Sequence, residues 1–284
     1  MAVKEKRVDF KPTCGNILSG VGPAAIEMGL VEPKDGVTEI KIAAVNTGAR
    51  VVAKIQTLNG QPNYEGTTEI AGVPGQSASI ALSFMDVVGA STGSFLPTGN
   101  LRDVINGIEV TCMDVAMPMV IARATDFGLV GNETVAELEE RTDFFIRMEQ
   151  MRIKAGALMG MGDVSQSVTP KFGLIAPAHN GGALAVRYFM PWNVHPSMAV
   201  TGAQCLASCA LTEGTVSDGL LDRPTASPAC VTLEHASGNF DLLVNFNAEN
   251  GFSLHSVGVV RTARKLAEGK VFVPSTIWAG HNSH

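Results

Sequence analysis

Cys14 is the residue whose position best suits acid–base chemistry. It directly precedes an apolar, helix-like stretch that runs to Leu30. The first N–H groups of a helix lack intrahelical acceptors and carry about half a positive charge, so they bind carboxylates and lower the pKa of a thiol. The sequence therefore predicts that Cys14 exchanges a proton with a bound acid. The alternative is a buried cysteine that only packs beside a turn.

A second segment repeats this arrangement. Residues 195–203 are rich in small residues and lead into an apolar stretch, 204–211, that is typical of a buried helix. If two halves of the molecule face each other, the N-termini of both helices meet at one cleft, which suits a small polycarboxylate. Cys205 and Cys209 are predicted to pack inside the second helix, and no metal site is expected.

Polar turn residues beside these helices are candidate contacts to carboxylates. For the amides and hydroxyls a plain turn or capping role is an equal alternative. A lysine before a strand is also often solvated, and a turn histidine often makes a structural hydrogen bond. The candidate substrate-binding residues are Gly15, Asn16, Thr98, Gly99, Asn100, Lys171, His195, Thr201, Gly202, His235, Ser237 and Gly238.

The elements that must position these residues are mostly strands. Alternation and turn signals predict two strands between 104 and 122, and an amphipathic helix capped by Asn132 follows them. The other predicted strands are residues 38–45, 50–58, 63–70, 77–84, 171–178, 183–189, 229–235, 240–248, 254–261 and 270–274. Many strands with two buried helices predict an α+β fold of two similar domains, each a curved, mostly antiparallel sheet wrapped around a central helix.

The predicted domain boundaries follow the Gly-Val-Pro-Gly break at residues 72–75. Residues 1–73 with 262–284 form the first domain, and residues 74–261 form the second. Only a short strand candidate, residues 8–11, precedes the first helix. We therefore expect the first domain to be incomplete at its start.

Composition narrows the class of protein. The 284 residues carry a net charge of −6, which argues against a nucleic-acid partner. Five cysteines without framework spacing indicate reduced thiols in a cytoplasm. Neither a signal peptide nor an apolar run of the ~20 residues that a membrane span needs is present. A homo-oligomer is a further expectation, because an incomplete domain exposes apolar surface.

Short motifs cover nearly the whole chain. In their sequence and order they resemble those of the PrpF family, which has the diaminopimelate-epimerase-like fold. The motifs lie at residues 14–27, 96–100, 114–118, 159–160, 169–171, 195–202, 235–238 and 261–264. The resemblance implies two facing domains, no cofactor, and movement of a proton on an unsaturated tricarboxylic acid. Residues 114–118 and 187–191 are more similar to 4-oxalomesaconate tautomerases than to 2-methylaconitate isomerases.

The sequence departs from this family in two places. The epimerases of the fold have a second cysteine at the start of the second helix, where residues 199–202 contain none. Family members also carry a leading Ser-Lys pair, and residues 1–13 do not match it, so we expect an N-terminally truncated chain. The expected function is keto–enol tautomerisation of 4-oxalomesaconate. The alternatives are 2-methylaconitate cis–trans isomerisation and a remnant that only binds small acids.

Overall fold

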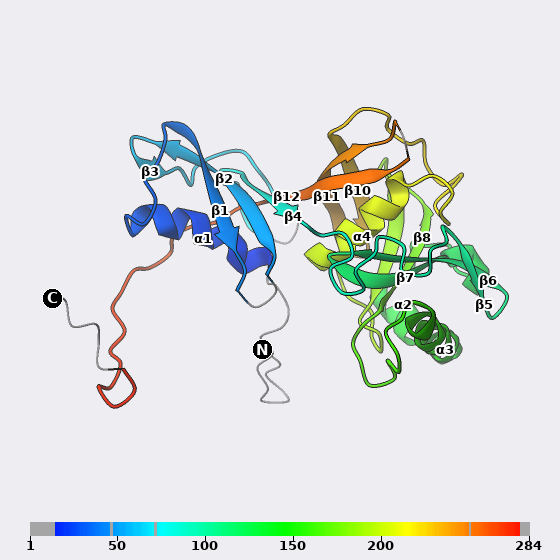
Figure 1. Cartoon of the computed structure of the whole chain (residues 1–284). Coiled ribbons are helices and arrows are strands. Elements are labelled where there is room, and N and C mark those ends of the chain that lie inside the picture. Colours follow the sequence, from blue (N-terminus) through cyan, green and yellow to red (C-terminus); the bar gives the residue numbers. More distant parts are fainter. Residues whose placement is uncertain (1–14, 46–47, 71–72, 250, 279–284) are drawn as a thin grey trace.

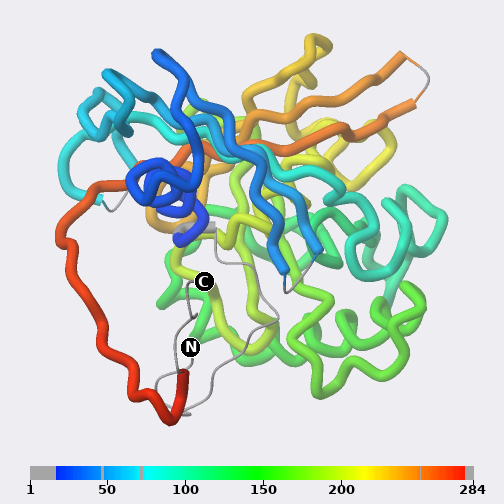
Figure 2. Tube along the Cα trace, turned by 60° about the vertical axis from the view of Figure 1, so that its left-hand side comes forward, coloured from blue at the N-terminus to red at the C-terminus, as the bar shows by residue number. Residues whose placement is uncertain are grey.

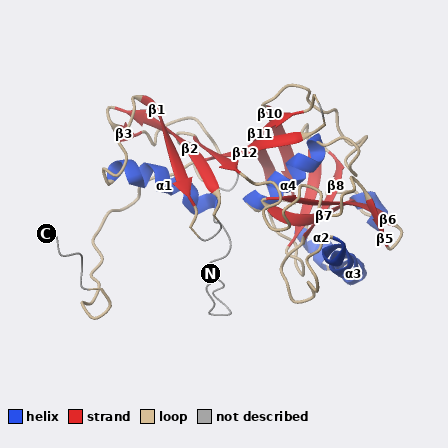
Figure 3. Cartoon of the chain, in the orientation of Figure 1, coloured by secondary structure: helices blue, strands red, loops and turns tan. Residues whose placement is uncertain are grey.

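The computed structural model describes residues 15–45, 48–70, 73–249 and 251–278, and these residues form two lobes (Figure 1). Their strands belong to a 12-stranded sheet with the order β1-β2-β4-β12-β11-β10-β9-β8-β7-β6-β5, with β3 paired to β2. Most neighbouring strands are antiparallel, whereas β7–β8 and β9–β10 are parallel. Helices pack against both lobes, which confirms the predicted α+β class (Figure 3).

The first lobe consists of one helix on a small sheet. Its elements are α1 (Gly15–Glu27), β1 (Gly36–Ala43), β2 (Arg50–Leu58), β3 (Gln61–Pro62) and β4 (Ile80–Met85). The helix lies close to β2 because Gly22 has no side chain. A Cβ atom at Gly22 would lie 2.5 Å from Cδ1 of Ile55. The first half of α1 lies on the side of this lobe that faces the second lobe (Figure 1).

The second lobe surrounds a buried helix, α4 (Val200–Leu211), in which every residue from Gly202 to Leu211 is buried. The apolar stretch therefore forms the predicted central helix. The strands of this lobe are β5 (Asp103–Ile105), β6 (Ile108–Val115), β7 (Met117–Arg123), β8 (Lys171–Pro177), β9 (Leu184–Phe189), β10 (Ala229–His235), β11 (Gly238–Asn247) and β12 (Ser253–Arg261).

Strands β4 and β12 connect the two lobes. Strand β4 pairs with β2 on one side and with β12 on the other, in antiparallel register. One hydrophobic core runs through this junction and contains residues of both α1 and α4. A second core lies on the opposite face of β6 to β9, under α3 (Thr142–Leu158). The lobes are thus joined by ladder hydrogen bonds as well as by the chain.

Two predicted strands do not form. Residues 63–70 make only an isolated bridge between Thr68 and Ser77. Residues 270–274 have no strand assignment, and Val271 and Phe272 are 90% and 92% exposed. A strand without a hydrogen-bonded neighbour is not stable. The segment after β12 instead extends away from the first lobe (Figure 2).

Two further elements differ from the prediction. The region between 103 and 123 contains three strands rather than two, because a turn at Ala116 separates β6 from β7. The single helix expected after Asn132 is two helices, α2 (Val135–Glu139) and α3, and the N-cap of α2 is Thr134. A short 3-10 helix, η1 (Ala124–Phe127), follows β7. None of the helices in the described ranges is long and apolar enough to cross a bilayer.

Candidate active site

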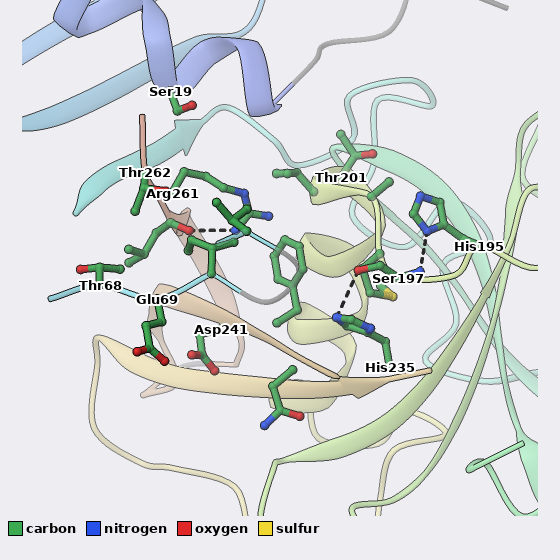
Figure 4. A pocket seen from close by; sticks show the side chains of 18 residues that line it. Ser19, Thr68, Glu69, His195, Ser197, Thr201, His235, Asp241, Arg261 and Thr262 are labelled. Carbon is green, nitrogen blue, oxygen red and sulfur yellow. Dashed lines mark hydrogen bonds between the residues drawn. The ribbon is translucent and has the colours of Figure 1, made fainter. Parts of the chain in front are cut away.

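A cavity of about 810 Å³ lies where the two lobes meet (Figure 4). The first lobe contributes Ser19 of α1 and residues 68–70 of the loop after β3. The second lobe contributes residues 195–201 and the hairpin between β10 and β11, and the end of β12 completes the wall. The cavity volume suits a small polycarboxylate. Ser19 of α1 and the first residues of α4 therefore line one cavity. That the N-termini of both helices meet there stays a prediction.

The N-terminus of α4 forms one end of this cavity. Ala199 is the N-cap, no side chain caps the helix, and no acidic residue lies in its first turn. Val200 and Thr201 both line the cavity. The first N–H groups of a helix have no intrahelical acceptors and carry partial positive charge. This end of the cavity can therefore bind a carboxylate.

Arg261 brings a full positive charge to the same cavity. Its guanidinium lies 4.4 Å from the centroid of the Phe240 ring, and its Nη1 donates to the carbonyl of Val260 at 2.8 Å. Burial lowers the pKa of Arg261, but an arginine stays charged at neutral pH. No ion pair within the described part of the chain includes Arg261. Its charge is therefore available to an anionic ligand.

Two acidic side chains also line the cavity, but they lie at its rim. Oε1 of Glu69 accepts a hydrogen bond from Gln76 at 2.8 Å, and Oδ1 of Asp241 accepts one from Thr232 at 2.7 Å. Figure 4 shows both on the side away from Thr201 and His195. The cavity is consequently positive at the α4 end and negative at the opposite rim.

His195 and His235 lie on neighbouring loops of the cavity wall. The N–H of Ser197 donates to Nδ1 of His195 at 3.0 Å, and Oγ of Ser197 lies 3.2 Å from Nε2 of His235. Burial lowers the pKa of both imidazoles, so both are neutral at pH 7. Ser237 ties the loops together, because its hydroxyl donates to the carbonyl of Pro196. The structure thus brings His195, His235 and Ser237 into one cluster.

Lys171 lies at the start of β8, close enough to His195 for its charge to lower the pKa of that imidazole. It does not line the cavity. Burial, together with the positive charge of Arg152, lowers the pKa of Lys171 to about 8. Its predicted role as a carboxylate clamp is untested, and in this conformation it acts on the site through its charge.

Thr98, Gly99 and Asn100 lie elsewhere. Oγ1 of Thr98 donates to Oδ2 of Asp103 at 2.7 Å, and Nδ2 of Asn100 donates to Oδ1 of the same carboxylate at 2.8 Å. These bonds form the turn that precedes β5, and none of the three residues lines the cavity. Here the structure shows the turn role that was the alternative in the sequence.

The remaining predicted residues are glycines and the start of α1. A Cβ atom at Gly202 would lie 2.5 Å from Cε2 of Tyr188, so this glycine lets α4 pack on β9. Gly238 pairs with His235 where β11 begins. Gly15 and Asn16 are the first residues of α1, and Cys14 lies outside the described residues.

Two polar residues of the cavity, Arg261 and Ser197, were among those not predicted from the sequence. Arg261 belongs to the motif at residues 261–264, but it was not proposed as a site residue. Ser197 was also not proposed. The repeated spacing of His195 with Ser197 and of His235 with Ser237 is the signal that identifies it.

No group of three or more histidine, cysteine, aspartate or glutamate side chains in the described segments could hold a metal ion. Cys205 and Cys209 are completely buried in the core, as predicted, and burial raises the pKa of both thiols. They are therefore packing residues rather than acid–base groups.

Comparison with known proteins places these observations in a family. The family model described as PrpF protein matches residues 1–274. The 4-oxalomesaconate tautomerase of Pseudomonas putida is 42% identical over 99% of this chain and 77% of its own length. The (4E)-oxalomesaconate Delta-isomerase of Novosphingobium is 38% identical over 92% of this chain and 72% of its own length. The solved structure of methylitaconate-delta-isomerase superposes with a TM-score of 0.86 at 28% identity, covering 98% of this chain and 77% of that chain.

Proposed function

This chain belongs to the PrpF family, and from that premise we propose that it is an isomerase that moves a proton within an unsaturated tricarboxylic acid. Keto–enol tautomerisation of 4-oxalomesaconate is the specific reaction we propose. The relative at 42% identity is named for 4-oxalomesaconate and the relative at 38% for (4E)-oxalomesaconate, whereas the methylitaconate enzyme is 28% identical.

The observation that carries the proposal is the charge arrangement of the cavity. The Arg261 guanidinium and the uncapped N-terminus of α4 supply two anion-binding groups from different elements. A substrate with several carboxylates can contact both at once. When a carbon of such a substrate loses a proton, the negative charge spreads onto the conjugated oxygen atoms. Fixed N–H donors that stabilise this charge lower the barrier, typically by 2.7–4 kcal/mol per donor.

Cys14 is the group that we propose for the proton transfer. It directly precedes the first residue of α1, and Ser19 of that helix lines the cavity. The thiolate takes a proton from one carbon, and the proton returns at another position of the conjugated system. No second cysteine at the start of α4 is available for two-thiol chemistry, since residues 199–202 contain none.

Solvent-deuterium exchange followed by NMR tests this function. The chain is incubated in D2O with 4-oxalomesaconate and, separately, with 2-methylaconitate, with and without a chelator. We expect exchange into 4-oxalomesaconate that a chelator does not change and that Cys14→Ser abolishes. Cys230→Ser is the matched control, because Cys230 is an exposed thiol outside the cavity.

The other outcomes contradict the proposal in different ways. Deuterium exchange into 2-methylaconitate alone would identify this acid, rather than 4-oxalomesaconate, as the substrate. A folded chain that binds a tricarboxylate without exchange would be a binding protein for small acids. We also propose, as the sequence predicted, that the chain is cytoplasmic, that it forms a homo-oligomer, and that it has no nucleic-acid or membrane partner.

A further inference from the structure

Two loops of the cavity wall have the same local hydrogen bond. The N–H of Ser197 donates to Nδ1 of His195 at 3.0 Å, and the N–H of Ser237 donates to Nδ1 of His235 at 3.1 Å. A ring nitrogen that accepts a hydrogen bond carries no hydrogen, so a neutral ring must carry its hydrogen on Nε2. The backbone therefore fixes the Nε2–H tautomer of both histidines.

The surroundings keep both rings neutral. Burial is the main cause that lowers the pKa of each imidazole. The charge of Lys171 on β8 acts on His195 in the same direction, and Arg187 on β9 acts on His235, as does His195. Backbone hydrogen bonds, at Ser197 for His195 and at Asn239 for His235, raise the pKa but do not outweigh burial. Glu234, adjacent to His235, is already engaged by the N–H groups of His179, Asn180 and Gly182. Among the described residues, no carboxylate contributes to the pKa shift of either imidazole.

The tautomer decides how Ser197 and His235 interact. Their Oγ and Nε2 atoms are 3.2 Å apart, which is also the arrangement of a nucleophile and its base. A base needs a bare Nε2, however, and here Nε2 carries the hydrogen. His235 therefore donates, and the Ser197 oxygen accepts. The hydroxyl hydrogen of Ser197 is then directed to a different acceptor.

The Ser197 residue belongs to the cavity wall. Ser197 lines the cavity next to the first turn of α4, and Figure 4 shows its oxygen between His235 and Thr201. An oxygen atom of a substrate bound at the α4 N-terminus is within the reach of such a group. Hydroxyl donors of this kind stabilise an oxyanion as it forms, and they do so without transferring a proton.

We propose that Ser197 donates a hydrogen bond to the substrate oxygen on which negative charge develops, and that His235 is a positioning residue that holds Ser197 in this orientation. The inference rests on the proposed function. Neither side chain gains or loses a proton in the reaction, since the proton that moves is exchanged by another group. His235 acts only as a neutral N–H donor.

Substitutions at His235 separate this role from that of a base. Glutamine carries an amide N–H at about the position of Nε2–H, whereas alanine has no donor. We expect His235→Ala and Ser197→Ala each to lower kcat about 100-fold, the range for one oxyanion donor. His235→Gln should keep kcat within about fivefold of the unaltered chain. The double variant Ser197→Ala/His235→Ala should lose no more than either single variant.

The pH dependence of activity also tests the role of His235, because it would not change if His235 were purely structural. Protonation of His235 puts a hydrogen on Nδ1 against the Ser237 N–H, so activity should fall as the pH drops below the lowered pKa of His235. In His235→Gln the contribution of this group to the acidic limb should be absent. An His235→Gln variant as inactive as His235→Ala would overturn the proposal, as would a Ser197→Ala variant with unaltered kcat.

Two measurements keep the inference distinct from the proposed function. Nitrogen-15 NMR of the histidines in the unaltered chain should show Nδ1 bare and Nε2 protonated at pH 7.5, and the opposite tautomer would overturn the inference. Tricarballylate has no double bond to isomerise, but one of its carboxylate oxygens can accept the Ser197 hydrogen bond, so it should bind five- to tenfold more weakly to Ser197→Ala. If the unaltered chain exchanges neither acid, the proposed function fails, whereas the tautomer and the tricarballylate affinities still decide the role of Ser197.

Discussion

The Arg261 guanidinium lies over the ring of Phe240, 4.4 Å from its centroid, inside the cavity between the lobes. The two side chains come from β12 and β11, which are adjacent strands. The aromatic face attracts the cation and holds the flexible side chain in place. Arg261 is thereby oriented before a ligand binds, which reduces the entropy that binding costs.

Replacing Arg261 should therefore weaken substrate binding. A hydrogen bond to a charged group contributes roughly 1.5–3 kcal/mol, so Arg261→Gln should raise KM about 10- to 100-fold. The effect on kcat should be smaller, because the guanidinium contacts the substrate before and during the reaction. Steady-state kinetics measure both parameters.

Arg264→Gln is the matched control for this prediction. Arg264 is exposed, lies outside the cavity, and donates to the carbonyl of Gln76 at 3.2 Å. Its loss should change KM less than twofold. Equal effects of the two substitutions would mean that net charge, rather than a specific contact, governs binding.

Gly202 should be intolerant of a side chain. A Cβ atom there would meet Cε2 of Tyr188 at 2.5 Å, and Tyr188 is 2% exposed and cannot move into solvent. Overpacking of this kind costs about 1–3 kcal/mol, so Gly202→Ala should lower the free energy of unfolding by that amount. Urea denaturation measures it.

Gly20→Ala tests the same substitution in the other central helix. At Gly20 a Cβ atom meets no atom within 4 Å. Alanine has the higher helix propensity, so this change should stabilise the chain by up to about 1 kcal/mol. A stabilising effect of Gly202→Ala would contradict the packing that we describe for α4.

Much of this architecture could be predicted from the sequence, because most elements have strong local patterns. The burial of β2 and β4 alternates residue by residue, and α4 is apolar on nearly every side. The predictions failed where a strand forms only if it pairs with a distant segment. Gly66 lets its loop approach Ala78 so closely that a Cβ atom would lie 2.6 Å from the Ala78 Cα, and the loop packs there instead of pairing.

The candidate site was less predictable than the fold. The pattern around His195 and His235 correctly located two residues of the cavity wall. Thr98 was predicted to bind substrate but does not line the cavity, and only the folded sheet shows this. Arg261 became a candidate only when its lack of an ion pair within the described residues and its contact with Phe240 were known. Such contacts join residues far apart in the sequence and leave no local pattern.

The start of α2 shows the same limit and gives a testable prediction. The sequence favoured Asn132 as the cap, whereas Thr134 Oγ1 accepts from the Glu137 N–H at 3.2 Å and Glu137 accepts in return from the Thr134 N–H at 2.7 Å. Thr134→Ala should cost about 1 kcal/mol of stability. Asn132→Ala should change the free energy of unfolding by less than about 0.5 kcal/mol. The reverse order in denaturation experiments would restore Asn132 as the cap.

The lowered pKa of Lys171 makes stability depend on pH in the alkaline range. Burial, with the charge of Arg152, lowers the pKa of this lysine from 10.5 to about 8 in the folded chain. Between these two values the unfolded chain binds more protons than the folded chain, so the free energy of unfolding rises with pH. Below pH 8 the lysine is charged in both states, and the whole penalty of burying its charge is present.

Lys171→Met should remove this contribution. The variant should be more stable than the unaltered chain at pH 7, and the difference should shrink as the pH rises from about 8 to above 10. Urea denaturation at several pH values measures the difference, which cancels the titration of the other groups. A difference that stays constant over this range would mean that the folded chain does not lower the pKa of Lys171. Its charge would then be solvated and unable to act on His195.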